Sequence, residues 1–136
     1  MIRLLVVADS GVVLEAVTAK LWHSGAVDIV GYASGTTNVS AIARSASPDV
    51  VLVDAMRWPG LALKRIAEVR ASVPAAVVVG LCESADDDWV IDGLDAGASV
   101  VVPRQLDAPT LAAVLRDVVR RDVVRAPAAV SMRSAA

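Results

Sequence analysis

The sequence has very little of the residue types on which many enzyme and metal sites depend. Cys82 is the only cysteine among 136 residues, which excludes an internal disulfide and a zinc site built from thiolates. His23 is the only histidine, so nearly all catalytic arrangements that pair serine or cysteine with histidine are excluded. The formal net charge is only −2, so the chain lacks the basic character that is typical of nucleic-acid binding.

Long apolar runs are also missing. No stretch approaches the roughly 18 apolar residues that a membrane helix needs, and Met1 is followed directly by the strand-like segment Ile2–Val7 rather than by a basic leader. We therefore expect a cytoplasmic protein with no membrane partner. What the sequence has is 56% hydrophobic residues, mainly valine and alanine, in a chain of single-domain length.

Runs rich in valine and isoleucine alternate with stretches of helical period. The predicted strands cover residues 2–7, 27–32, 50–53, 76–81 and 99–102. Most are apolar on both faces, as parallel strands covered by helices must be. This alternation predicts an α/β fold in which a doubly wound parallel sheet lies between two layers of helices.

Start and stop signals place the helices between these strands. The first helix is expected to begin after a Ser10 cap, and the next two to cover residues 38–45 and 60–72. The fourth is predicted to start at Ser84 or Ala85, with aspartates 86–88 in its first turn and Gly97 at its C-terminus. The last begins near residue 107. We expect residues 1–122 to form one domain and residues 123–136, rich in alanine, serine and proline, to form a mobile tail.

Two carboxylates lie where predicted strands end. Asp9 follows the first strand and Asp54 closes the third. Open α/β sheets bind ligands beyond the carboxyl ends of their strands, where the strand order reverses. If the order is 2-1-3-4-5, the two acids face each other and need a shared proton or a hard cation such as Mg²⁺. The alternative is that both are helix caps or solvated loop residues.

Four segments in order carry a resemblance to a known family. Residues 2–10 (IRLLVVADS) and 48–54 (PDVVLVD), with Trp58-Pro59-Gly60 and Ala96-Gly97-Ala98, resemble the receiver domains of bacterial two-component response regulators over about residues 1–121. Residues 28–33 also resemble the second strand of regulators in the helix-turn-helix class. The resemblance implies a five-stranded, flavodoxin-like (CheY-like) sheet with three α/β/α layers and the order 2-1-3-4-5.

The resemblance also implies site residues and partners. Asp54 would accept a phosphoryl group from a histidine kinase or a small phosphodonor. Asp9, Asp54 and the backbone carbonyl of Met56 would hold Mg²⁺, which offsets the negative charge of the incoming group. A downstream protein partner or a missing effector domain would receive the signal. Homodimerisation through the last two helices is a further expectation, as is Trp89 as an interface residue.

Several positions depart from the family pattern. Ala8 stands where receivers usually carry a second acid, so Mg²⁺ binding is expected to be weak. Cys82 replaces a hydroxyl residue that contacts the phosphoryl group; a redox sensor and a small buried residue are the alternatives for it. Arg104 replaces a lysine, and either contacts phosphate or only pairs with one of the carboxylates. Val101 replaces an aromatic switch residue.

Three functions remain open from the sequence. The first is a receiver, not an enzyme in the ordinary sense, that accepts a phosphoryl group on Asp54 and helps to catalyse its own modification. The second is a degenerate receiver that binds a partner without phosphorylation. The third is a cofactor carrier on a flavodoxin-like sheet, which the turn after the first strand disfavours because it lacks a phosphate-binding glycine pattern.

Overall fold

The computed structural model describes residues 1–9, 11–34, 37–55, 58–84 and 88–135, and side chains within these ranges except at 12–14 and 122–135. Strands and helices alternate as the sequence predicts. None of the helices in this part of the chain combines the length and the apolar character that crossing a membrane requires. The elements are β1 (Ile2–Val7), α1 (Gly11–Trp22), β2 (Val27–Ala33), α2 (Val39–Ala46), β3 (Val50–Asp54), α3 (Pro59–Ser72), β4 (Val77–Cys82), α4 (Trp89–Ala96), β5 (Val100–Pro103) and α5 (Ala108–Ala135).

The strands form a parallel sheet in the order β2-β1-β3-β4-β5, which confirms the predicted fold class. The strand order reverses at β1 and β3, which are hydrogen-bonded neighbours with Val7 opposite Val53. On the other side of β3, Asp54 lies opposite Leu81 of β4. Because all strands run in one direction, the loops that follow them leave from one edge, here called the carboxyl edge. Any site made by these loops must therefore form there.

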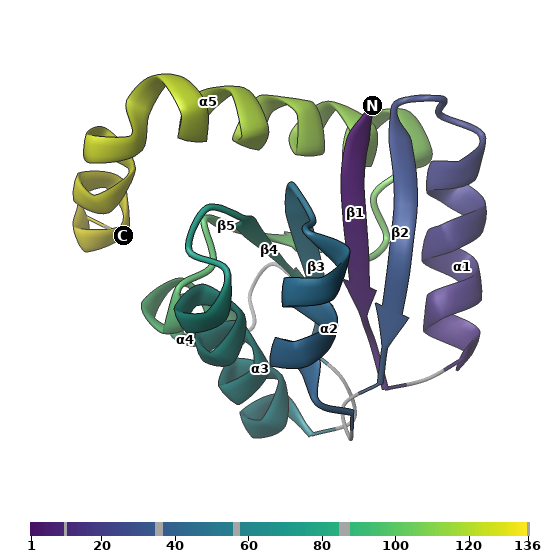
Figure 1. The fold of residues 1–136 in the computed structure, drawn as a ribbon, viewed down its shortest axis with the longest axis horizontal. Coiled ribbons are helices and arrows are strands. Elements are labelled where there is room, and N and C mark those ends of the chain that lie inside the picture. The colour runs from purple at the N-terminus through teal and green to yellow at the C-terminus, as the bar shows by residue number, and fades with distance from the viewer. Residues whose placement is uncertain (10, 35–36, 56–57, 85–87, 136) are drawn as a thin grey trace.

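Helices cover both faces of the sheet (Figure 1). One core lies under α2, α3 and α4 and includes Val39, Ile66 and Trp89; the other lies under α1 and α5 and includes Leu21 and Leu115. Every residue of β3 and β4 is buried. This explains their unbroken apolar sequences, because a central strand between two helical layers has no face open to water.

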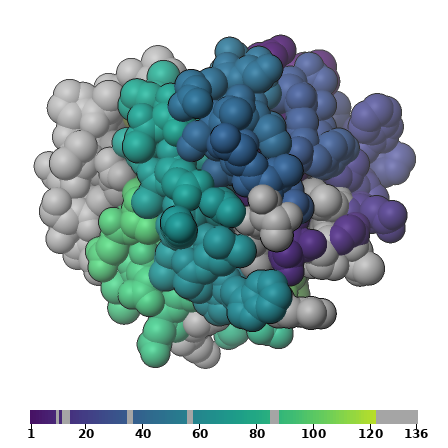
Figure 2. All heavy atoms as spheres, turned by 60° about the horizontal axis from the view of Figure 1, so that its bottom comes forward, coloured from purple at the N-terminus to yellow at the C-terminus, as the bar shows by residue number. Residues whose placement is uncertain are grey.

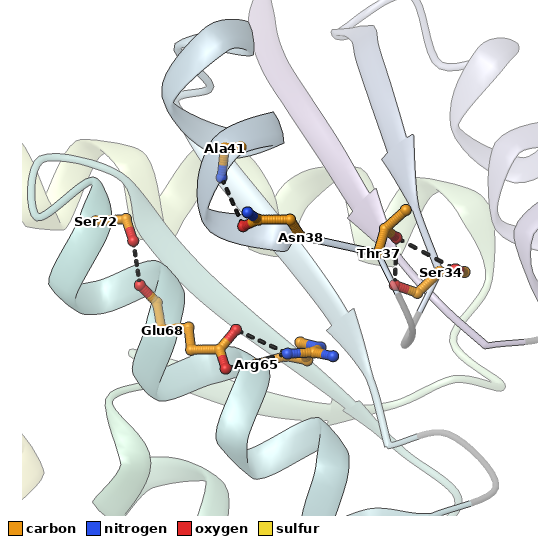
Figure 3. A network of polar contacts seen from close by, with 7 residues as sticks. All are labelled: Ser34, Thr37, Asn38, Ala41, Arg65, Glu68 and Ser72. Atoms are coloured by element: carbon orange, nitrogen blue, oxygen red, sulfur yellow. Dashed lines mark hydrogen bonds and ion pairs between the residues drawn. The ribbon is translucent and has the colours of Figure 1, made fainter.

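Short-range polar contacts close the connection from β2 to α2 (Figure 3). The Asn38 side chain accepts a hydrogen bond from the Ala41 backbone at 3.2 Å, which satisfies one of the free N–H groups at the start of α2. The Thr37 hydroxyl donates to the Ser34 carbonyl at 2.7 Å and lies 3.2 Å from the Ser34 hydroxyl. These contacts fix the turn beside the carboxyl end of β1.

The start of α4 differs from the prediction. The helix begins at Trp89, with Asp88 as its N-cap residue, so the expected start at Ser84 or Ala85 is wrong. The Trp89 ring is buried in the core, and this tertiary contact outweighs the weak preference of acidic side chains for a first helical turn. Gly97 ends the helix as predicted, with a φ of 130°. Ala85, Asp86 and Asp87 lie outside the described residues.

The last helix is longer than the sequence suggests. α5 extends to Ala135, past residue 122, where the tail was expected to begin, and runs on beyond the sheet in Figure 1. Arg121 forms an ion pair with Asp117, one helical turn earlier. The side chains after Arg121 lie outside the described residues, and the division into a domain of residues 1–122 and a tail stays a prediction.

Candidate functional site

The two predicted acids leave the sheet at the carboxyl edge from neighbouring strands. Asp54 is the last residue of β3, and Asp9 follows β1 by two residues. Because Val7 pairs with Val53, Ala8 comes level with Asp54 and Asp9 lies just beyond it. Figure 2 is turned so that this edge comes forward, with α2 and α3 along one side of it. The topology thus brings both carboxylates to the same edge, as the sequence predicts.

Asp54 is the only charged residue that is buried in the described part of the chain, with 3% of its surface exposed. Its Oδ1 accepts hydrogen bonds from Arg104, at 3.0 Å from Nε and 2.8 Å from Nη2. A buried carboxylate needs such a partner, because leaving it without a compensating charge is costly. Arg104 therefore pairs with Asp54, and its suggested contact with phosphate stays a prediction.

Arg104 is brought to the site by the end of β5. Its backbone N–H donates to the Cys82 carbonyl at 2.9 Å and so extends the pairing of β4 with β5 by one bond. The Arg104 side chain is 28% exposed, so one part of the guanidinium faces solvent while the other contacts Asp54. This places a permanent positive charge beside the acid at the carboxyl edge.

Cys82 ends β4, as predicted, opposite Pro103. It is fully buried and belongs to the core under α2, α3 and α4. A thiol that senses oxidants is usually accessible and ionised, whereas this one lies in an apolar environment. The structure favours the small buried residue, and its suggested role as a phosphoryl contact stays a prediction.

Trp89 occupies the space beneath α4. Its ring is 3% exposed, and its indole N–H donates to the Pro59 carbonyl at 3.1 Å. Gly80 makes room for it, because a Cβ at Gly80 would lie 3.0 Å from the ring. A Cβ at Gly93 would lie 3.5 Å from the ring, an ordinary contact distance. The interface role suggested for Trp89 stays a prediction, and it requires the ring to leave this position. Val101, half-buried, packs against the same core.

The structure describes two of the three metal ligands that the resemblance implies, Asp9 and Asp54. Asp9 is half-buried and has no hydrogen bond or ion pair among the described residues. No group of three or more histidine, cysteine or acidic side chains suited to a metal occurs in the part of the chain that the structure describes. Ala8 explains this, because it supplies no ligand. Two carboxylates still fit a hard divalent cation, with water completing its shell. Met56, the third suggested ligand, lies outside the described residues.

Sequence reasoning missed Lys20. This residue of α1 reaches the loop after β5, where Nζ lies 2.9 Å from the carbonyl oxygens of both Arg104 and Leu106. The two hydrogen bonds join residues that are 84 and 86 positions apart in the sequence. A lone lysine in a helix gives no sequence signal for such a contact.

Comparison with known proteins agrees with this geometry. No protein-family model matches the chain. It is 32% identical over 121 residues to the transcriptional regulatory protein CseB of Streptomyces avermitilis, with 88% of this chain and 49% of that protein covered. It is 25% identical over 118 residues to the DNA-binding transcriptional activator DevR/DosR of Mycobacterium tuberculosis, with 87% and 54% covered. The chain thus spans about half the length of these curated relatives.

A solved structure matches over nearly its whole length. The signal receiver domain of the putative response regulator NarL from Mycobacterium tuberculosis superposes with a TM-score of 0.76 at 25% identity, covering 88% of this chain and 96% of that one. The chain belongs to the receiver domains of two-component response regulators.

Proposed function

We propose that this receiver accepts a phosphoryl group on Asp54 and passes the resulting change to a protein partner. The observation that carries the proposal is a buried carboxylate at the carboxyl edge of β3, held by a cation from the loop after β5. An acid kept in a low-dielectric site beside a fixed positive charge is well placed to attack an anionic phosphoryl group.

The transfer has a simple balance of bonds. A carboxylate oxygen of Asp54 forms a bond to phosphorus, while the bond between phosphorus and the leaving group of the donor breaks. The leaving group keeps the electron pair: acetate leaves as an anion, whereas a nitrogen leaving group takes a proton from solvent. The guanidinium of Arg104 lies beside the carboxylate, where it offsets the charge that accumulates between acid and phosphoryl oxygens.

Asp9, Asp54 and the carbonyl of Met56 would hold Mg²⁺ at this edge. When bound, the cation lowers the repulsion between the carboxylate and the phosphoryl oxygens. Arg104 already supplies one positive charge to Asp54, and Ala8 supplies no third acid, so we expect the cation to bind weakly.

Intact mass spectrometry tests phosphoryl acceptance. The chain is incubated with acetyl phosphate or phosphoramidate and Mg²⁺, and we expect it to gain one phosphoryl group. Asp54→Asn is expected to gain none, whereas Asp95→Asn, which changes an exposed acid on α4, is expected to behave as the unmodified chain does. Equal labelling of Asp54→Asn and the unmodified chain would place the acceptor elsewhere.

A degenerate receiver is the second candidate. The ion pair of Arg104 with Asp54, the alanine at position 8, the buried Cys82 and the valine at position 101 favour it. In that case the chain binds its partner in the same way with Asp54 or asparagine at position 54, and it gains no phosphoryl group from either donor.

Restoring the missing acid is expected to strengthen the metal site. Ala8→Asp adds a carboxylate level with Asp54, at a position that is now fully buried. We expect Mg²⁺ affinity to rise about tenfold to a hundredfold, in line with one added charged ligand contact. Without Mg²⁺ the variant should melt at a lower temperature than the unmodified chain, because two buried carboxylates repel each other. Calorimetric titration and thermal melting with and without Mg²⁺ measure both effects; Ala8→Asn is the uncharged control.

The relatives suggest the setting of this function. Both are regulators of transcription about twice as long as the region they share with this chain. We propose that a histidine kinase supplies the phosphoryl group in the cytoplasm, and that an effector domain or a separate protein reads the change. A homodimer through α4 and α5 is one form this output can take. Sedimentation before and after phosphorylation measures it, and an unchanged mass would argue against it.

A further inference from the structure

The loop between β5 and α5 places a cation that contacts Asp54. It consists of residues 104–107, and its first residue is Arg104. Two contacts tie it to the end of β4: the Arg104 N–H donates to the Cys82 carbonyl at 2.9 Å, and the Gln105 side chain donates to the Glu83 carbonyl at 2.8 Å. These bonds connect the loop to the end of β4.

Lys20 of α1 contacts the same loop. Its ammonium donates to the carbonyl oxygens of Arg104 and Leu106, both at 2.9 Å, and so spans Gln105 between them. The ammonium is half-buried. Hydrogen bonds from a charged donor are stronger than neutral ones, and partial burial strengthens them further.

The same ammonium also faces the start of α5. Asp107 caps this helix through a 2.9 Å hydrogen bond from the Thr110 backbone. Hydrogen bonds from the side chain and backbone of Thr110 lower the pKa of Asp107, and the charge of Lys20 adds a smaller lowering. Lys20 thus contacts the backbone of Arg104 and Leu106 and also acts on the Asp107 carboxylate through its charge.

We propose that Lys20 is a positioning residue of the phosphoryl-acceptor site, which sets the backbone position from which Arg104 contacts Asp54. The inference rests on the proposed function. The carbonyl held by Lys20 belongs to the same residue whose guanidinium reaches the acid, so a shift of the loop moves both. α1 begins two residues after Asp9, and Lys20, in its last turn, joins this helix to the loop after β5.

A purely structural lysine would behave differently. Its loss would lower the melting temperature but leave the bond between Arg104 and Asp54 intact in the folded protein. A positioning residue changes that bond itself. The Arg104 Nε proton, which is donated to Asp54 Oδ1 at 3.0 Å, reports on the bond directly.

The first experiment measures hydrogen exchange of the Arg104 Nε–H by NMR in the full chain. We expect Lys20→Met to speed this exchange about tenfold, because the hydrogen bond that protects the proton is weakened. Lys64→Met is the matched control: it removes the other lysine of the chain, which is exposed on α3, and should leave the exchange unchanged. Unchanged exchange in folded Lys20→Met overturns the proposal.

The second experiment measures the rate of labelling by phosphoramidate with Mg²⁺. We expect Lys20→Met to slow labelling about tenfold, a loss comparable to one charged hydrogen bond, and to have no further effect when Arg104→Ala is already present. An equal slowing in both backgrounds means that Lys20 does not act through Arg104, and contradicts the proposal.

The two readouts separate the two ideas. If the unmodified chain is never labelled, the proposed function fails, and the exchange of the Arg104 proton still decides the role of Lys20. If Lys20→Met does not fold, Lys20→Gln replaces it, since glutamine keeps a side-chain N–H donor but lacks the positive charge. Faster exchange in Lys20→Gln supports the positioning role, and exchange equal to that of the unmodified chain rejects it.

Discussion

Arg104→Ala is expected to lower the free energy of unfolding by about 2–4 kcal/mol, the range for removing one partner of a buried ion pair, reduced slightly because Arg104 is partly exposed. Asp54 is only 3% exposed, and the substitution removes the two hydrogen bonds that its carboxylate accepts from Nε and Nη2 of Arg104. Urea unfolding followed by circular dichroism measures the change.

A second variant isolates the cause of this loss. Asp54→Asn removes the buried charge, so the double variant Asp54→Asn with Arg104→Ala should recover most of the stability lost in Arg104→Ala alone. Arg116→Ala, an exposed arginine on α5, controls for the loss of a cation as such. If Arg104→Ala has the same effect with aspartate and with asparagine at position 54, the ion pair does not stabilise the fold.

Gly97→Ala is expected to have an effect of similar size, about 2–4 kcal/mol, because it combines backbone strain with a steric clash. Gly97 ends α4 with a φ of 130°, a conformation that residues with a side chain rarely adopt. A Cβ at this position would lie 2.4 Å from Cγ of Arg70. Arg70 cannot move away freely, since its guanidinium donates to the Ala76 carbonyl at 3.2 Å, just before β4.

Gly60→Ala is the matched control for this prediction. Gly60 lies in the first turn of α3, has no positive φ, and a Cβ there would meet nothing within 4 Å. Alanine favours helices over glycine by up to about 1 kcal/mol, so this variant should be neutral or more stable. Urea midpoints with unchanged m-values measure both variants. Equal midpoints for Gly97→Ala and the unmodified chain would show that the turn relaxes without cost.

These two predictions address opposite ends of β5. Arg104 contacts Asp54 from the loop after β5, whereas Gly97 lies in the turn between α4 and β5. Loss of the first changes the charge around Asp54, and loss of the second changes the packing of α4 without touching the acid. Labelling of folded Gly97→Ala by a phosphodonor should therefore resemble that of the unmodified chain.

The strands follow closely from the apolar runs of the sequence, and their order follows from the family resemblance. β3 and β4 consist almost wholly of apolar residues, which only a strand covered on both faces tolerates, and strict alternation with helices leaves few topologies for a parallel sheet. The position of Asp54 at a strand end follows from the same pattern. The start of α4 was not predicted correctly. The helix begins at Trp89, whose ring is buried, and local sequence signals carry no information about that tertiary contact.

The periodicity of apolar residues determined the fold class and placed Asp9 and Asp54 at strand ends, and the family resemblance supplied the strand order that brings both acids to the carboxyl edge. Only the tertiary structure decided that Arg104 contacts Asp54, that the Trp89 ring is buried, and that Lys20 holds the loop after β5. These contacts join residues 50 to 86 positions apart or depend on a gap left by glycines. Such pairings are set by how the helical layers close over the sheet, which no local pattern records.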